Sequence, residues 1–152
     1  MEIQTKYLGE IEVALEKVLM FSSGLMGFEE SKEFVLLDIP DNDNFKFLQD
    51  IKNSYIAFLV VNPWNFFCEY QMDIPDEELI KMQIKSKEDI AIYNIVTICD
   101  VFKNSTANLL APIILNVKSN IGKQYILQEE NYTTKHPLYT EEITGEKNVS
   151  IK

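Results

Sequence analysis

The sequence contains no arginine. All 14 of its basic residues are lysines, against 24 aspartates and glutamates, and the formal net charge is −10. Nucleic-acid binding needs a basic patch, and bidentate contacts to phosphates and bases favour arginine, so we expect no direct nucleic-acid partner. A chain this acidic instead attracts basic proteins at low salt.

Cysteine is also scarce. Cys68 and Cys99 each lie in an apolar stretch, and neither belongs to a C-x-x-C pair. Free cysteine behaves as a small hydrophobic residue, so we expect two buried, reduced thiols. The sequence leaves open a disulfide between them, although a reducing cytosol disfavours one.

The residue patterns of catalysis are missing as well. His136, between Lys135 and Pro137, is the one histidine, and we expect a surface or packing role for it. The chain has none of the motifs H-E-x-x-H, G-x-S-x-G and G-x-G-x-x-G, and no Walker-type lysine loop. Paired carboxylates such as Glu69 and Asp73 are expected on a solvated face, because acidic residues are common throughout. We therefore predict no enzymatic activity, no cofactor and no metal.

Long hydrophobic runs are absent. The longest, Ile56 to Val61, has six residues, whereas a membrane-spanning helix needs roughly 20. The first ten residues lack the basic and apolar regions of a secretion signal, so we expect a cytoplasmic protein without a membrane segment. The length of 152 residues fits one domain. We predict a domain over residues 1–143, a frayed tail over residues 144–152 and a monomer when alone.

Short alternating segments separated by turn residues predict a fold dominated by β-strands. Strands are expected at Glu2–Tyr7, Glu10–Val13, Lys32–Ile39, Asn44–Asp50, Tyr55–Val61, Phe66–Met72 and Ile90–Cys99. A short helix is expected at Asp76–Met82 with Asp76 as its cap, and one helical turn at Ser86–Asp89. These elements indicate one mainly β, barrel-like or sandwich-like antiparallel domain with one or two short helices.

The stretch from Asn104 to Leu127 predicts a buried hairpin. Its apolar runs, residues 107–117 and 124–127, are joined by a polar turn at residues 118–122. Pro112 cannot donate to a sheet ladder, so it is expected at a strand start, an edge or a bulge. Earlier in the chain, Gly24 and Gly27 surround Leu25 and Met26, which predicts an ordered loop with its apolar side chains turned inward.

Three motifs in the chain have the order found in a known protein family. The pattern T-x-N-L-x-A-P-I-x-x-N followed by G-x-Q is matched by Thr106, Asn108, Leu109, Ala111, Pro112, Ile113, Asn116, Gly122 and Gln124. Residues 21–28, FSSGLMGF, are similar to G-L-P-G-F, with Met26 in place of the proline. Residues 57–70 match A-F-x-V-x-x-P-x-x-F-x-x-[DE]-Y. In these motifs the chain resembles the flagellar assembly factor FliW family.

The resemblance implies a compact β-rich barrel without enzymatic activity. It also implies cytoplasmic binding to flagellin and, when flagellin is scarce, to the RNA-binding translational regulator CsrA. By binding CsrA, such proteins relieve repression of the flagellin message. Two alternatives stay open: a flagellin chaperone or adaptor without a CsrA partner, and a small-molecule-binding β-barrel with a deep polar pocket.

Two stretches are predicted to form or support the partner surface. Residues 62–73 combine aromatic side chains with an acidic rim, the composition of many interfaces, although such aromatics are more often core. We expect Asn65, Glu69 and Tyr70 to be exposed there. The second stretch is residues 104–116. The candidate partner-binding residues are Asn65, Glu69, Tyr70, Asp73, Asp76, Asn104, Thr106 and Asn108.

Overall fold

The computed structural model describes residues 1–129 and 131–139. The tail expected at residues 144–152 lies outside the described residues, as do the last residues of the expected domain. No helix in the described ranges is long and apolar enough to cross a bilayer.

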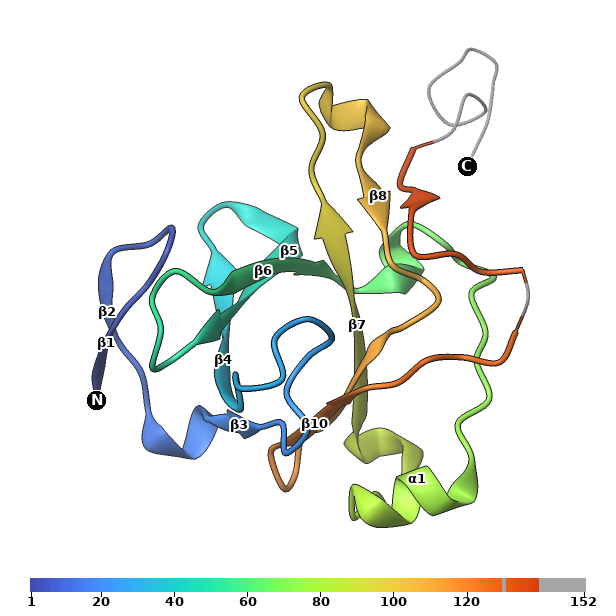
Figure 1. Cartoon of the computed structure of the whole chain (residues 1–152), viewed down its shortest axis with the longest axis horizontal. Coiled ribbons are helices and arrows are strands. Elements are labelled where there is room, and N and C mark those ends of the chain that lie inside the picture. Colours follow the sequence, from blue (N-terminus) through green and yellow to red (C-terminus); the bar gives the residue numbers. More distant parts are fainter. Residues whose placement is uncertain (130, 140–152) are drawn as a thin grey trace.

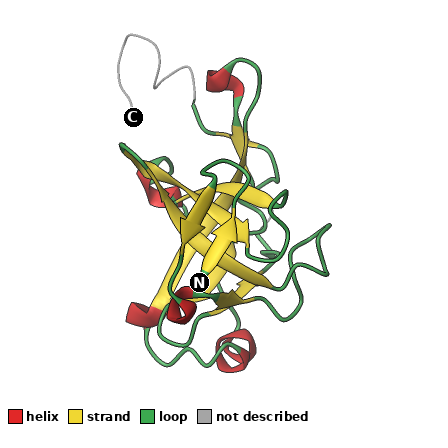
Figure 2. Cartoon of the chain, turned by 90° about the vertical axis from the view of Figure 1, so that its left-hand side faces the viewer, coloured by secondary structure: helices red, strands yellow, loops and turns green. Residues whose placement is uncertain are grey.

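Within the described residues, seven strands close into a barrel, which confirms the mainly β prediction. They are β3 (Leu19–Met20), β4 (Glu33–Ile39), β5 (Asn42–Asp50), β6 (Ala57–Val61), β7 (Ile90–Thr97), β9 (Ile113–Asn116) and β10 (Ile121–Gln124). Their order is β7, β6, β5, β4, β3, β10, β9, and β9 pairs back onto β7. Figures 1 and 2 show these strands arranged around a common interior. All neighbours are antiparallel except β3 and β10, which are parallel.

Four further strands lie outside this ring. β1 (Glu2–Gln4) and β2 (Glu10–Glu12) form a separate antiparallel hairpin, as predicted, although both strands are shorter than expected. β8 (Thr106–Ala107) pairs with the end of β7, and β11 (His136–Pro137) pairs with β8. β11 therefore attaches the C-terminal part of the described chain to the sheet.

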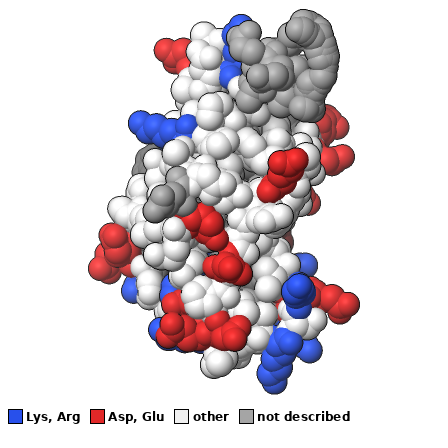
Figure 3. All heavy atoms as spheres, turned by 90° about the vertical axis from the view of Figure 1, so that its right-hand side faces the viewer, with Lys and Arg blue, Asp and Glu red and all other residues white. Residues whose placement is uncertain are grey.

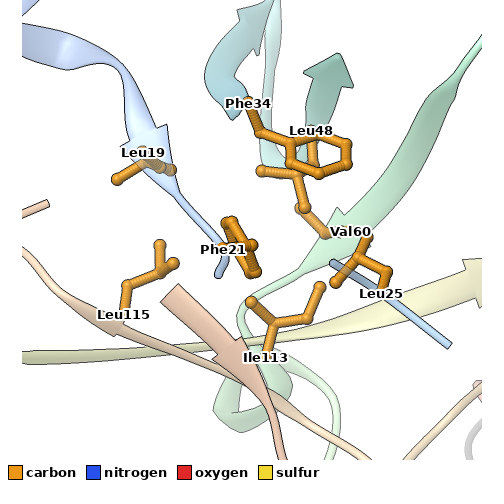
Figure 4. Packing of buried hydrophobic residues seen from close by; sticks show 8 residues of the cluster. All are labelled: Leu19, Phe21, Leu25, Phe34, Leu48, Val60, Ile113 and Leu115. Carbon is orange, nitrogen blue, oxygen red and sulfur yellow. The ribbon is translucent and has the colours of Figure 1, made fainter. Parts of the chain in front are cut away.

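The interior of the barrel is apolar and centres on Phe21, which is fully buried. Its cluster consists of Leu19, Phe21, Leu25, Phe34, Leu48, Val60, Ile113 and Leu115, drawn in Figure 4. Gly122 lies directly against the Phe21 ring, because a Cβ atom at this position would come within 2.3 Å of the ring carbon Cζ. The loop after β3 contributes Leu25 to this core as predicted, whereas Met26 is exposed, against the prediction.

The helical elements are short. They are α1 (Asp76–Lys81) and the 3₁₀ turns η1 (Leu15–Lys17), η2 (Pro63–Asn65), η3 (Lys87–Asp89) and η4 (Phe102–Asn104). The predicted helix is confirmed, but its N-cap is Pro75 and Asp76 makes no capping bond. The predicted turn at Ser86 is also confirmed, because the Ser86 hydroxyl accepts a hydrogen bond from the Glu88 N–H.

Two strand predictions need correction. Residues 66–72 form turns instead of a strand, because the Pro63 carbonyl accepts from the N–H groups of Phe66 and Phe67 and bends the chain. In the predicted hairpin, β9 starts directly after Pro112 as expected, but the turn is at residues 117–120. The second strand, β10 (Ile121–Gln124), begins within the predicted turn and ends where the predicted apolar run at residues 124–127 begins. The Asn116 side-chain oxygen accepts from the Lys118 and Ser119 N–H groups and so holds the turn at these residues.

The prediction of buried cysteines is wrong. Cys68 and Cys99 are both exposed, and neither forms a disulfide. Cys68 lies in a turn beyond η2, and Cys99 lies beyond the end of β7, which stops at Thr97. The apolar stretches around both residues suggested strands, but the chain has left the sheet at each position.

We predict that Gly122→Ala lowers the free energy of unfolding by about 1–3 kcal/mol, the usual cost of overpacking a closed core. The Phe21 ring is enclosed by the other core side chains and has little room to move away. Urea unfolding measures the change. Ser119→Ala, at an exposed position in the adjoining turn, is the control and should stay within about 0.5 kcal/mol of the parent. Equal stability of the two variants would contradict this account of the core.

Candidate protein-binding surface

The chain between β6 and α1, residues 62–75, is irregular but held in place. We call it the connecting segment. At its start, the Asn62 side-chain oxygen accepts from the Trp64 N–H at 3.0 Å. The Trp64 indole N–H then donates to the Tyr70 carbonyl at 2.9 Å. These bonds fold the first half of the segment into a compact unit.

Tyr70 fastens this unit to the barrel. Its hydroxyl donates to the Leu109 carbonyl at 2.6 Å and accepts from the Asn94 side-chain amide at 3.2 Å. The same amide donates to the Asn108 carbonyl at 2.8 Å. Burial raises the pKa of Tyr70 to about 12, so the hydroxyl keeps its proton at neutral pH. Tyr70 is only 4 % exposed, so the expectation of an exposed Tyr70 is wrong.

The second half of the connecting segment is tied to the C-terminal part of the described chain. The Gln71 N–H donates to the Tyr132 hydroxyl at 2.9 Å, and the Tyr132 ring packs edge-on against Tyr70 at 4.8 Å. The Asp73 N–H donates to Glu129 Oε2 at 3.3 Å. Tyr132 and Glu129 cannot be identified as part of this surface from the sequence, because no local pattern indicates a partner some 60 residues away.

Carboxylates gather where these two parts meet. Asp73, Asp76 and Glu129 line one pocket of about 570 Å³, and Glu69 is exposed earlier on the same segment. The second oxygen of Glu129, Oε1, is buried without a hydrogen-bond partner among the described residues. Figure 3 shows acidic side chains along the middle of this side of the molecule, with lysines mainly toward its ends. Charges of one sign grouped in this way attract a basic partner.

The predicted residues on the second stretch have different environments. Asn104 is exposed in η4, and its carbonyl accepts from the Cys99 thiol at 3.2 Å. Thr106 is half-buried in β8. The Asn108 side chain is hydrogen-bonded within the chain, because its oxygen accepts from the Ala111 N–H at 2.9 Å.

The structure therefore does not bring all eight candidates onto one patch. Asn65, Glu69, Asp73, Asp76 and Asn104 are exposed. Tyr70 and Asn108 meet through Asn94, beneath the surface. The β7–β8 hairpin, which carries Asn104, projects at the opposite end of the molecule from α1 (Figure 1). The connecting segment is thus the better-supported surface, and Asn104 marks a separate projection.

The aromatic side chains of the connecting segment divide between core and surface. Phe66 and Phe67 are partly buried, and Phe66 contacts Tyr139 edge-on at 5.9 Å. His136 packs against Phe67 at 5.3 Å, which confirms a packing role, and burial lowers its pKa. Trp64 remains 43 % exposed. It is the aromatic residue of this segment that is most available to a partner.

Groups arranged for metal binding are not found in the part of the chain that the structure describes. No group of three or more His, Cys, Asp and Glu side chains there could hold a metal ion. What the connecting segment presents is exposed polar and aromatic side chains on a fixed backbone. Exposed aromatic and polar side chains also make up many protein–protein interfaces.

The polar residues of the sequence motifs hold the fold together. Gln124 accepts from the Met26 N–H at 2.9 Å and donates to the Ala111 carbonyl at 3.2 Å, so it joins two of the motifs. The Asn116 amide donates to the carbonyls of Met82 and Gln83 and so fixes the end of α1 to β9. These motif residues act within the chain.

We predict that Tyr70→Phe lowers the free energy of unfolding by about 1–3 kcal/mol, because the Leu109 carbonyl and the Asn94 amide each lose a buried partner. Urea unfolding at pH 7 measures it. Tyr55→Phe is the matched control, since Tyr55 is 81 % exposed, and it should change stability by less than about 0.5 kcal/mol. A Tyr70→Phe variant as stable as the control would show that the buried network contributes little.

Comparison with known proteins agrees with this architecture. Residues 2–138 match the family model described as FliW protein. The chain is 40 % identical to the flagellar assembly factor FliW of Bacillus subtilis over 138 residues, 91 % of this chain and 96 % of that protein. It is also 40 % identical to the Oceanobacillus iheyensis FliW over 134 residues, 88 % of this chain and 91 % of that one.

A solved structure extends the agreement to three dimensions. The crystal structure of a flagellar assembly factor FliW superposes on this chain with a TM-score of 0.88 at 40 % identity, covering 93 % of this chain and 99 % of the other. Sequence motifs, barrel topology and these matches all agree, and the chain belongs to the FliW family of flagellar assembly factors.

Proposed function

We propose that this chain is a non-enzymatic, cytoplasmic regulator that binds flagellin and antagonises the translational repressor CsrA by protein–protein binding. The observation that carries the proposal is the family match over residues 2–138. In this role the chain couples the flagellin level to translation of its message: flagellin occupies the chain when abundant, and CsrA is captured when flagellin is scarce.

Charge and surface chemistry support a protein partner. The chain has a net charge of −10 and no arginine, which suits docking to a basic protein and opposes direct contact with RNA. The exposed carboxylates Glu69 and Asp73 lie on the connecting segment, and Asp76 follows as the first residue of α1. The half-exposed Trp64 lines the same groove as Asp73. An aromatic anchor beside charged groups is a common arrangement at interfaces.

A competition experiment tests the proposal. Purified chain is titrated by calorimetry with CsrA and with flagellin from the same bacterium, singly and then together. We expect each protein to bind alone and flagellin to displace CsrA. Binding of flagellin without any binding of CsrA would instead indicate a chaperone or adaptor. Binding of neither would contradict the proposed function.

Salt should act mainly on the rate of association. If the acidic surface steers CsrA toward the chain, raising the salt concentration lowers the association rate constant more than it raises the dissociation rate constant. Surface plasmon resonance across a salt series measures both constants. An association rate that does not depend on salt would rule out electrostatic steering.

Charge reversal tests the location of the surface. The double variant Glu69→Lys, Asp73→Lys should weaken CsrA binding by about tenfold or more, because both carboxylates are exposed on the connecting segment. Circular dichroism checks that it folds. The control Glu2→Lys, Glu10→Lys makes the same charge change on the β1–β2 hairpin. Equal affinity of the two folded double variants would place the interface elsewhere.

A further inference from the structure

The barrel is closed on one side by a short pairing. β6 and β7 are joined only at Val60 with Ile95 and at Val61 with Asn94. Beyond Val61 the chain enters the connecting segment, whose first turn, η2, still contacts β7 but does not pair with it as a strand. The first half of β7 therefore continues without β6 beside it.

The hydrogen bonds on the other edge of β7 show which way its backbone groups point. In an antiparallel pair, successive residues alternately face the partner strand and face away. The Val117 N–H donates to the Asp89 carbonyl at 2.8 Å, so Asp89, Ala91 and Tyr93 face β9. Ile92 accordingly directs its N–H and C=O toward the edge that β6 has left.

Ile92 has no backbone partner on that edge. If the β6–β7 register is continued, Pro63 stands opposite Ile92, and proline has no N–H to donate. The Pro63 carbonyl accepts instead from the Phe66 and Phe67 N–H groups, at 3.0 and 2.7 Å. Outside the strand ladders, no hydrogen bond in the described ranges reaches the backbone of Ile92. Such an edge is a template for another strand.

A groove of about 620 Å³ runs along this edge. Besides residues 90–93 of β7, its lining includes three apolar side chains from the connecting segment and α1, Met72, Ile74 and Leu79. The polar lining residues Asn62, Asp73 and Lys87 and the Trp64 ring complete it. A strand edge beside apolar side chains fits an extended peptide, because the peptide backbone bonds to the strand while alternate side chains meet the apolar residues.

The groove has an acidic end. It shares Asp73 and Ile74 with the neighbouring pocket of about 570 Å³, which Asp76 and Glu129 also line. The Glu129 Oε1 atom is buried there without a hydrogen-bond partner among the described residues. A lysine or arginine on the incoming peptide would meet these carboxylates.

We propose that the open edge of β7 accepts an extended segment of a protein partner as an added β-strand. One residue of the segment exchanges hydrogen bonds with the Ile92 N–H and C=O, and its neighbours, at roughly 3.3 Å each, place an apolar side chain against Met72 and Ile74. A basic residue next to them pairs with the Asp73 end. The inference rests on the proposed function in taking a protein as the occupant.

Amide hydrogen exchange, resolved by residue with NMR, tests this directly. In the chain alone, the Ile92 amide should exchange about tenfold or more faster than those of Ala91 and Tyr93, which are bonded to β9. Saturating CsrA or flagellin, whichever binds through this edge, should slow the Ile92 exchange about tenfold or more, because the added strand pairs with it. Slow exchange of Ile92 in the chain alone would overturn the proposal.

A charge variant provides the second readout. Asp73→Lys should weaken, by about tenfold, binding of the partner that protects Ile92. Glu10→Lys, an equal charge change on β2, should leave that affinity unchanged. Equal affinities of the two variants would overturn the basic-residue part of the proposal.

The outcomes separate this inference from the proposed function. If a partner binds and the Ile92 exchange is unchanged, the strand addition is wrong and the function stands. If neither CsrA nor flagellin binds, the function is wrong, and a displayed library of random peptides becomes the probe. Selected peptides that slow the Ile92 exchange would support the open edge, and a library that yields none would overturn it.

Discussion

Closure of the barrel depends on strand β7. One of its edges pairs with β9 and then β8, and the other pairs with β6. Its alternating sequence covers both faces, because Ala91, Tyr93 and Ile95 pack on the barrel core while Ile92 is buried on the outer side. Displacing β7 would therefore disturb the pairing with β6 on one edge and with β8 and β9 on the other.

Asn94 links the position of β7 to the connecting segment, because it is hydrogen-bonded to Tyr70 of that segment. It is fully buried on the outer side of β7, where a polar side chain is costly unless it is hydrogen-bonded. Its NH2 group donates to the Asn108 carbonyl and the Tyr70 hydroxyl, whereas its Oδ1 has no hydrogen-bond partner among the described residues. The connecting segment must therefore lie over β7 for the barrel to be stable. This explains how residues without regular secondary structure can have a fixed position.

The sequence motifs carry information about fold more than about partners. At position 122 the Phe21 ring fills the space that a larger side chain would need, so glycine fits there. Gln124 joins the loop after β3 to Ala111 through two hydrogen bonds. Asn116 holds α1 through two carbonyls. These groups are already hydrogen-bonded or packed within the chain. Proteins that share the motifs are therefore expected to share the barrel fold.

Local patterns predicted most of the barrel. Alternation and turn residues identified β4, β5, β6 and β7 nearly to their ends, and the acidic first turn identified α1. They failed at residues 66–72, where the chain turns because of bonds to Pro63, which no periodicity encodes. Closure of the ring by β7 and β9 and the parallel pair of β3 with β10 depend on distant contacts. The contacts of Tyr132 and Glu129 also join distant parts of the chain, so local patterns could not predict them.

The candidate surface is preorganised by the part of the chain that follows the barrel. Tyr132 bonds to the Gln71 N–H and packs on Tyr70, and Glu129 bonds to the Asp73 N–H. Fixing a loop before binding lowers the ordering cost that binding must overcome. The carboxylates at residues 69–76 are thus presented by two segments that meet only in the folded chain. Loss of the Tyr132 contacts would therefore loosen the surface while leaving the barrel core intact.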